Sequence, residues 1–166
     1  MPGKIAIIGG GPVGSYLASL LGKDFDVTVF EQGKIGEPVQ CTGIVTQNID
    51  SIVALQEERK NATINTIRQT RIHSPREKMD LSLRPNYIID RTVFDRGIAR
   101  KAKDAGVHYI HERVKKVSET TITTTKEYLF DIIIGADGPG SIVRTQIDPR
   151  KIRLRHGFQA RVRLRN

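Results

Sequence analysis

The chain has 166 residues, enough for one domain with a buried core but too few for a cofactor domain together with a complete substrate domain. Hydrophobic residues make up 38% of the chain, and no apolar run is long enough for a transmembrane helix. The single cysteine, Cys41, excludes an internal disulfide and a cysteine-based metal cluster. We therefore expect a cytoplasmic protein. The formal net charge of +9 comes mostly from residues 150–166, which hold seven basic residues and no acidic one, so the nearly neutral remainder argues against a nucleic-acid-binding domain.

The first 31 residues follow the pattern of a βαβ unit. Apolar runs predict strands at residues 4–8 and 26–30, and the spacing between them predicts a helix from Pro12 to about Leu21. The motif Gly9-x-Gly11-x-x-Gly14 lies between the first strand and the helix, and the acidic Glu31 follows the second strand. This is the context of a Rossmann-type dinucleotide site, so we expect an α/β fold that binds the ADP half of FAD or NAD(P).

Each part of this motif has a physical role. Gly9 permits the tight turn, Gly11 lets a pyrophosphate approach the backbone, and Gly14 lets helix and strand pack closely. The pyrophosphate would sit at the helix N-terminus, where free N–H groups and the helix dipole favour an anion. Glu31 would accept hydrogen bonds from the adenosine ribose, and its charge argues against a 2′-phosphate there. The alternative is that the glycines serve packing alone.

The next segments interrupt the α/β pattern. Residues 32–43 are expected to form a loop, followed by a helix from about Thr46 to Leu55. Residues 62–89 are rich in Thr, Ile and Arg, with turns predicted at Ser74-Pro75 and Arg84-Pro85. They predict short inserted antiparallel strands, whose sheet should lie away from the ADP site.

The pattern then returns to α/β. Helical spacing predicts a helix over 91–105 that stops at Gly106, and a strand follows at 107–110. Residues 120–130 are expected to form a hairpin, and 131–134 a buried parallel strand that ends at Gly135-Ala136-Asp137-Gly138. A turn after such a strand lies at the carboxyl edge where α/β proteins bind ligands, although Asp137-Gly138 also fits an ordinary turn.

The C-terminal tail alternates basic and apolar residues. This pattern predicts a strand over 152–166 with one basic face, which is either solvated or in contact with anionic lipid or phosphate. Nucleic acid is disfavoured because aromatic residues do not alternate with the basic ones. We expect a FAD-binding domain over residues 1–150, with the inserted strands at 62–89, and over 151–166 the first strand of a truncated substrate domain.

Several motifs together resemble the geranylgeranyl reductase family, within the larger group of FAD enzymes that includes the aromatic-ring hydroxylases. The resemblance rests on Gly9 to Ser15, Ile35-Gly36-x-Pro38-Val39-Gln40-Cys41-x-Gly43, Arg91-x-x-Phe94-Asp95, and Gly135 to Gly138 with Ser141 and Arg144. It runs along essentially the whole chain, which matches only the N-terminal portion, less than half, of a typical member. The segment from Pro38 to Gly43 points to the prenyl reductases, including those of archaeal-type membrane lipids.

The resemblance implies a set of FAD-binding residues. Gly14 and Glu31 would contact the ADP part, and Cys41 and Thr42 would line the flavin. Arg91 would reach the cofactor from the helix start, and Val114, in the strand after the one that begins at Val107, would meet the adenine through its backbone. The full set is Gly9, Gly11, Val13, Gly14, Glu31, Cys41, Thr42, Gly43, Arg91, Val114, Asp137 and Gly138. Thr42 stands where family members often have glycine. By residue type alone, Cys41 also fits a small buried hydrophobe and Arg91 a surface charge.

The resemblance implies a reaction as well. Two electrons would enter FAD from an external donor, NAD(P)H or ferredoxin, and leave as a hydride to an isoprenoid C=C, with a proton added to the other carbon. No residue is an obvious general acid, and the four histidines lack the spacing of metal ligands. The family's third flavin motif has no counterpart before Asn166.

Three hypotheses about function therefore remain. The first is a prenyl reductase of membrane lipids that is completed by missing sequence or by a second polypeptide. The second is an FAD-dependent hydroxylase-like monooxygenase, and the third is a truncated dinucleotide-binding module without turnover. We also expect self-association through the 152–166 edge, or a second chain there, and peripheral contact with a membrane.

Overall fold

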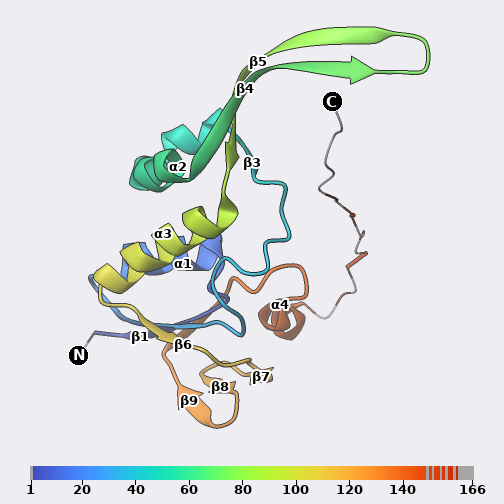
Figure 1. Ribbon diagram of the computed structural model, residues 1–166. Coiled ribbons are helices and arrows are strands. Elements are labelled where there is room, and N and C mark those ends of the chain that lie inside the picture. Colours follow the sequence, from blue (N-terminus) through green and yellow to red (C-terminus); the bar gives the residue numbers. More distant parts are fainter. Residues whose placement is uncertain are drawn as a thin grey trace.

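The computed structural model describes residues 2–148, together with 150, 152–153, 155, 157–158 and 160. Its centre is a parallel sheet in the order β10-β1-β2-β6 (Figure 1). The strands are β1 (Lys4–Ile8), β2 (Asp26–Phe30), β6 (His108–Ile110) and β10 (Ile132–Gly135). The chain therefore has the predicted α/β fold with a parallel sheet, and β1 and β2 have the predicted bounds.

Two helices cover one face of this sheet. α1 (Pro12–Leu21) connects β1 to β2, and α3 (Arg91–Asp104) packs beside it and leads into β6 (Figure 1). Successive side chains of a strand point to opposite faces, so Ile5 and Ile7 pack toward the helices, where they meet Ala18 and Ala102. These close contacts fix α1, and the glycine loop before it, against the sheet.

The opposite face is covered by a small antiparallel sheet and a short helix. The sheet contains β7 (Lys116–Val117), β8 (Thr121–Thr123) and β9 (Glu127–Leu129), so the hairpin predicted over 120–130 is confirmed. α4 (Ile142–Ile147), which was not predicted, follows β10. Side chains from both elements surround Phe30, which is 1% exposed, and thereby fix the end of β2 that carries Glu31.

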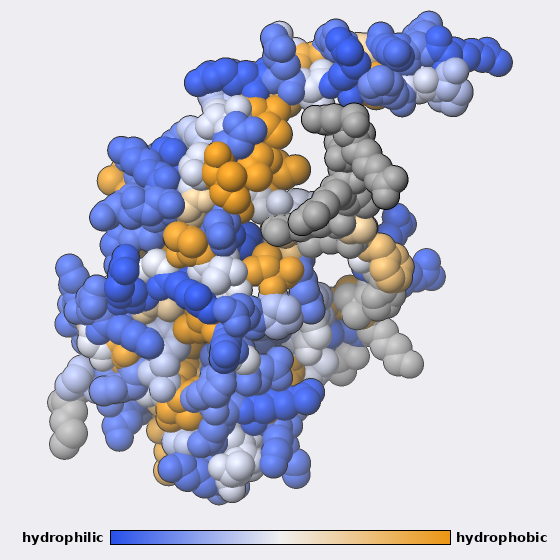
Figure 2. Space-filling view, viewed as in Figure 1, coloured by the Kyte–Doolittle hydropathy of each residue, from blue (hydrophilic) through white to orange (hydrophobic). Residues whose placement is uncertain are grey.

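A long ribbon is inserted between the two halves of the α/β pattern. β4 (Thr63–His73) and β5 (Lys78–Ile89) pair antiparallel, with β3 (Ile44–Thr46) beside β5. The ribbon projects from the body near α3, well away from the parallel sheet (Figure 1). Hydrophilic residues cover most of its length, and apolar residues gather where it joins the body (Figure 2). The antiparallel insertion and the turn at Ser74-Pro75 agree with the sequence analysis, but the predicted short strands are wrong, because β4 has 11 residues and β5 has 12.

The predicted turn at Arg84-Pro85 is wrong, because both residues lie inside β5. The ladder between β4 and β5 shifts register between Ile67 and Gln69, which pair with Asn86 and Ser82. Pro85 therefore occupies an irregular stretch where its missing N–H does not break a regular ladder.

The predicted helix over 46–55 is also replaced by other structure. Two 3-10 turns, η1 (Gln47–Ser51) and η2 (Val53–Leu55), precede a short helix α2 (Gln56–Ala62). Ile52, with φ −91° and ψ 84°, separates the turns, and Thr46 pairs with Asn86 in the ribbon. Strand pairing and this non-helical residue prevent a continuous helix.

Two further expectations need correction. The strand at 131–134 pairs parallel with β1 as predicted, but it is the edge strand of the described sheet, and Ile132 is 51% exposed. Val114 lies in the segment between β6 and β7 and not in a strand, with its side chain packed against the cluster around Phe30.

Most of the predicted strand over 152–166 lies outside the described residues, and so does the predicted start of the substrate domain. Among the residues that are described, no helix has the length and apolar character needed to cross a membrane.

Candidate functional site

The loop between β1 and α1 brings the three glycines of the motif to the carboxyl edge of the sheet. Gly9 has φ +104°, and a Cβ there would lie 2.4 Å from the carbonyl oxygen of Ala136. A Cβ on Gly14 would lie 2.0 Å from the carbonyl oxygen of Gly9. Both contacts are far shorter than packing allows, so the fold itself requires glycine at these two positions.

Gly11 differs from its two neighbours in the motif. It has φ −65°, which any residue adopts, and a Cβ there would meet nothing within 4 Å. The open space lies at the N-terminus of α1, where Pro12 and the 71% exposed Val13 begin the first turn. Because first-turn N–H groups have no partner inside the helix, this space suits an anion such as a pyrophosphate. Glycine at position 11 is explained by a ligand better than by packing.

Glu31, at the end of β2, borders the same loop. Its Oε2 accepts a hydrogen bond of 2.7 Å from the N–H of Gly10, and its Oε1 accepts one of 2.8 Å from the N–H of Gly33. The carboxylate thus fixes two backbone segments, a role that the motif alone does not reveal. Each oxygen keeps acceptor capacity, so the hydroxyl groups of a ribose also fit Glu31.

Two linked hydroxyl groups, those of Ser15 and Tyr109, hold the glycine loop in place. Ser15 is fully buried and donates a hydrogen bond of 2.9 Å to the carbonyl oxygen of Gly10, while the Tyr109 hydroxyl donates one of 3.0 Å to Ser15 Oγ. Burial raises the pKa of Tyr109, which keeps the hydroxyl a donor. Sequence reasoning missed this pair, and its only signal was a serine on the buried side of α1.

Asp137 and Gly138 follow β10 and lie next to the glycine loop, since a Cβ on Gly9 would be 2.9 Å from Asp137 Cα. Asp137 Oδ2 accepts a hydrogen bond of 2.7 Å from the N–H of Ile142 at the start of α4. Its Oδ1 is buried and has no hydrogen-bond partner among the described residues. Asp137 therefore has a structural role in the turn after β10, and its contact with the cofactor stays a prediction.

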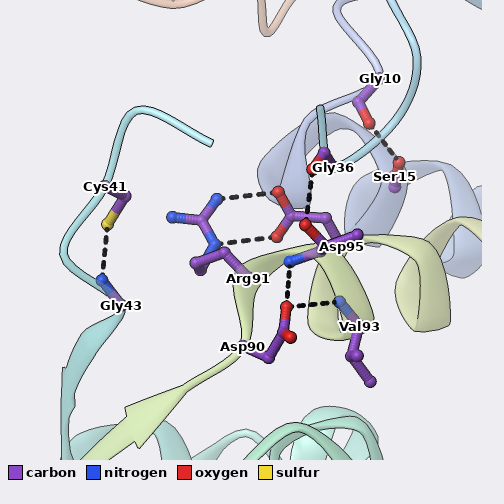
Figure 3. A network of polar contacts seen from close by, with 10 residues as sticks. Gly10, Ser15, Gly36, Cys41, Gly43, Asp90, Arg91, Val93 and Asp95 are labelled. Atoms are coloured by element: carbon purple, nitrogen blue, oxygen red, sulfur yellow. Dashed lines mark hydrogen bonds and ion pairs between the residues drawn. The ribbon is translucent and has the colours of Figure 1, made fainter. Parts of the chain in front are cut away.

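Arg91 and Cys41 form a second group at the start of α3 (Figure 3). Arg91 makes two hydrogen bonds of 2.9 Å to the carboxylate of Asp95, which raises the pKa of the arginine above its usual value, and Cys41 adds to this effect. The guanidinium lies between Asp95 and the loop that carries Cys41 (Figure 3). Arg91 is thus half-buried and held in place, unlike a free surface charge.

The loop with Cys41 is shaped by two glycines in left-handed conformation. Gly36 has φ +75° and packs on Thr92, whose hydroxyl donates a hydrogen bond of 2.8 Å to the Gly36 carbonyl. Gly43 also has φ +75° and packs on the backbone of Ile89. Cys41 itself is exposed, and its sulfur accepts a weak hydrogen bond of 3.5 Å from the N–H of Gly43. The alternative of Cys41 as a small buried hydrophobe is wrong, and Thr42 is exposed as well.

The structure thus gathers the predicted residues into two groups. Gly9, Gly11, Gly14, Glu31 and Asp137 surround the N-terminus of α1. Cys41, Gly43 and Arg91 lie at the N-terminus of α3. The side chain of Val114 packs against the cluster around Phe30 on the opposite face of the sheet, and its predicted contact with the adenine through the backbone stays a prediction.

No family model matches the chain. The chain is 29% identical over 149 residues to an uncharacterized protein of Methanocaldococcus jannaschii, covering 83% of this chain and 37% of that protein. It is 28% identical over 158 residues to digeranylgeranylglycerophospholipid reductase 1 of Methanococcoides burtonii, covering 84% of this chain and 38% of that enzyme. The chain therefore spans less than two fifths of the curated relatives it matches.

Solved structures agree on the fold. A geranylgeranyl bacteriochlorophyll reductase-like protein of Thermoplasma acidophilum matches 82% of this chain and 39% of its own, with a TM-score of 0.72 and 22% identity. The flavin-dependent brominase Bmp2 matches 82% of this chain and 38% of its own, with a TM-score of 0.67 and 22% identity. PqsL of P. aeruginosa matches 93% of this chain and 48% of its own, with a TM-score of 0.76 and 16% identity. The chain is thus similar, along most of its length, to part of a digeranylgeranylglycerophospholipid reductase, and it has a Rossmann-like α/β fold that flavin-dependent enzymes also use.

Proposed function

We propose that the chain binds FAD and forms the cofactor-binding part of a reductase that saturates isoprenoid C=C bonds in the prenyl chains of membrane lipids. The observation that carries the cofactor assignment is the open space over Gly11 at the N-terminus of α1, next to Gly10, whose N–H is bound by Glu31. An anion at the helix end and a diol at Glu31 are the groups that would satisfy these residues.

The residues of this chain would have distinct roles toward FAD. First-turn N–H groups of α1 would hold the pyrophosphate, and Glu31 would hold the adenosine ribose. Arg91, Cys41 and Gly43 would border the flavin end, where the ion pair with Asp95 keeps the guanidinium in one position. When bound and reduced by two electrons from an external donor, the flavin would supply the hydride for one alkene carbon, and a proton would be added to the other carbon.

The substrate class rests on the sequence relative and the motif from Pro38 to Gly43. The Methanococcoides burtonii relative is named for digeranylgeranylglycerophospholipid reduction, at 28% identity across 84% of this chain. The brominase and PqsL share the fold at lower identity, which does not discriminate between reduction, hydroxylation and halogenation. A prenyl-reductase role is therefore preferred over a hydroxylase-like one.

A chimera tests this proposal. The segment of the Methanococcoides burtonii reductase that aligns with this chain is replaced by this chain, and the product is checked for bound flavin and a cooperative thermal transition. With dithionite as the electron source, the folded and flavin-loaded chimera is expected to reduce the prenyl chains of the lipid. A folded chimera that holds flavin but leaves the lipid unsaturated would contradict the proposed substrate class.

A further inference from the structure

The outer part of the ribbon, residues 69–82, consists of two strands that pair only with each other among the described residues. β3 pairs with β5 at Asn86 to Ile88, near the root of the ribbon. The outer ribbon projects away from the rest of the molecule (Figure 1), and all its side chains from Arg71 to Asp80 are exposed. A two-stranded hairpin with no layer packed against it is marginally stable in water. The outer ribbon is therefore a surface that gains stability from a partner.

The pairing register gives the outer ribbon two unlike faces. Residues directly opposite each other in an antiparallel pair lie on one face, and successive pairs alternate between the faces. Ile72 pairs with Met79 and Thr70 pairs with Leu81, so these four side chains share a mostly apolar face. Ile72 is 51% exposed and Met79 is 54% exposed, so this face is open near the end of the ribbon. The other face carries the polar pairs Gln69–Ser82, Arg71–Asp80 and His73–Lys78.

Positive charge dominates the rest of the ribbon. Strands β4 and β5 and their turn hold five Arg and Lys residues against two acidic residues. Arg71 and Asp80 form an exposed ion pair, which leaves Glu77 as the second acidic residue. Four exposed cations have no ion pair within the described part of the chain, namely Arg68, Arg76, Lys78 and Arg84. The apolar pair near the end of the ribbon thus lies among unpaired cations.

This combination fits an anionic membrane surface better than a second copy of the chain. At a membrane, apolar side chains enter the boundary between headgroups and acyl chains, while Lys and Arg reach the phosphates beside them. A second ribbon would bring the same cations to the contact, so like charges would oppose it.

We propose that the outer ribbon docks on an anionic phospholipid bilayer. Ile72 and Met79 enter the headgroup boundary, and Arg76 and Lys78 contact the phosphates. The choice of a membrane rests on the proposed function, in which the substrate is a membrane lipid. Docking would keep the chain at the surface that holds this lipid.

Vesicle co-sedimentation of the full chain, without FAD, tests the contribution of charge. The vesicles contain phosphatidylcholine alone or equal parts of phosphatidylcholine and phosphatidylglycerol, and the chain is expected to bind only the second kind. The test variant is Arg76→Gln/Lys78→Gln. The matched control, Arg113→Gln/Lys115→Gln, removes the same residue types from exposed positions between β6 and β7, at the end of the molecule opposite the ribbon (Figure 1).

The two variants should differ clearly. Loss of two cations from the contact is expected to weaken binding about tenfold or more in the test variant. Salt screens charges over about 8 Å, so the distant control is expected to lose less than about twofold. A dye that responds to polarity tests the apolar contact, because Cys41→Ser removes the only thiol of the chain. In that background, the dye on Met79→Cys should shift to the blue on anionic vesicles, and the dye on Ser82→Cys, on the other face, should shift far less.

Several results would overturn the proposal. No loss in the test variant, or equal loss in both variants, would mean that another basic segment, such as residues 150–166, binds the vesicles. Equal dye shifts at both positions would exclude insertion of the apolar face. A chain that binds neither kind of vesicle would leave a protein partner as the occupant of the ribbon. Neither assay contains FAD or measures reduction, so these failures are distinct from failure of the proposed function, which the chimera decides.

Discussion

A substitution at Gly11 can test whether the glycine motif binds a ligand, because a side chain at this position does not disturb the packing of the loop. Gly11→Val places a branched side chain in the open space at the start of α1 without a clash against the protein. The variant should fold like the parent chain but bind FAD about a hundredfold more weakly, because it blocks several charged hydrogen bonds to the pyrophosphate. Circular dichroism and a flavin titration measure the two effects.

The matched control is Gly14→Val, which is expected to reduce stability sharply. Its Cβ would overlap the carbonyl oxygen of Gly9, at 2.0 Å. If Gly11→Val keeps both its fold and its affinity for FAD, the open space is not the pyrophosphate site.

Glu31 has two roles that two substitutions can separate. Glu31→Ala removes the ribose acceptor and also frees the N–H groups of Gly10 and Gly33, so FAD binding should weaken by about 1.5–3 kcal/mol. Glu31→Gln keeps one carbonyl acceptor and should fall between the parent and the alanine variant. Flavin fluorescence titration gives the order, and equal affinity in all three proteins would remove Glu31 from the site.

The thiol of Cys41 offers a chemical probe of the flavin end. Cys41 is exposed and lies in the loop opposite Arg91, so a thiol reagent should label it readily in the FAD-free chain. Bound FAD should slow the labelling, since its flavin end would cover the loop. Mass spectrometry follows the reaction with and without FAD, and identical rates would contradict the placement of Cys41 beside the flavin.

The sequence predicts the glycine motif and Glu31, but it does not predict the hydrogen bond between Ser15 and Tyr109. The spacing of Gly9, Gly11, Gly14 and Glu31 has a local cause, because a tight turn between strand and helix determines it. The hydrogen bond between Ser15 and Tyr109 joins residues 94 positions apart, and it depends on the pairing of β6 with β2 and the packing of α1 on β2. No local pattern encodes such a contact.

Helix α3 carries Arg91 at its first position, so the stability of its first turn matters to the candidate flavin end of the site. Asp90 caps this helix by accepting hydrogen bonds of 2.8 Å from Thr92 N and 3.1 Å from Val93 N. Asp90→Ala is therefore expected to lower the free energy of unfolding by about 1 kcal/mol in urea denaturation. Asp104→Ala, at the other end of α3, is the control and should not lower stability, because an acidic residue there opposes the helix dipole. Equal effects of the two substitutions would contradict the capping role.

Element prediction succeeded where the signal is local and failed where pairing decides. β1, α1 and β2 follow from periodicity and from the glycines, and their bounds agree with the sequence analysis. The stretch from Thr46 to Leu55 has apolar spacing that suits a helix. Its first residue, Thr46, instead pairs with Asn86 as part of β3. The run at 132–134 is apolar enough for a central strand, and only the sheet order reveals an edge.

At the scale of the whole molecule, apolar surface remains exposed at several places. Ile132 on the edge strand β10 is 51% exposed, Ile152 is 53% exposed and Phe158 is 99% exposed. Exposed apolar side chains and an open sheet edge favour contact with another chain. We expect concentration-dependent self-association, or association with a second polypeptide. Analytical ultracentrifugation over a range of concentrations tests this, and a stable monomer at high concentration would contradict self-association.

The absorbance spectrum of the chain shows whether the glycine loop and Glu31 form a FAD site. The purified chain is incubated with FAD, freed of unbound cofactor, and measured beside Gly11→Val treated in the same way. We expect near-stoichiometric flavin absorbance in the parent chain and almost none in the variant. A parent chain that is folded but retains no flavin, or a variant that retains as much as the parent, would show that FAD does not bind there.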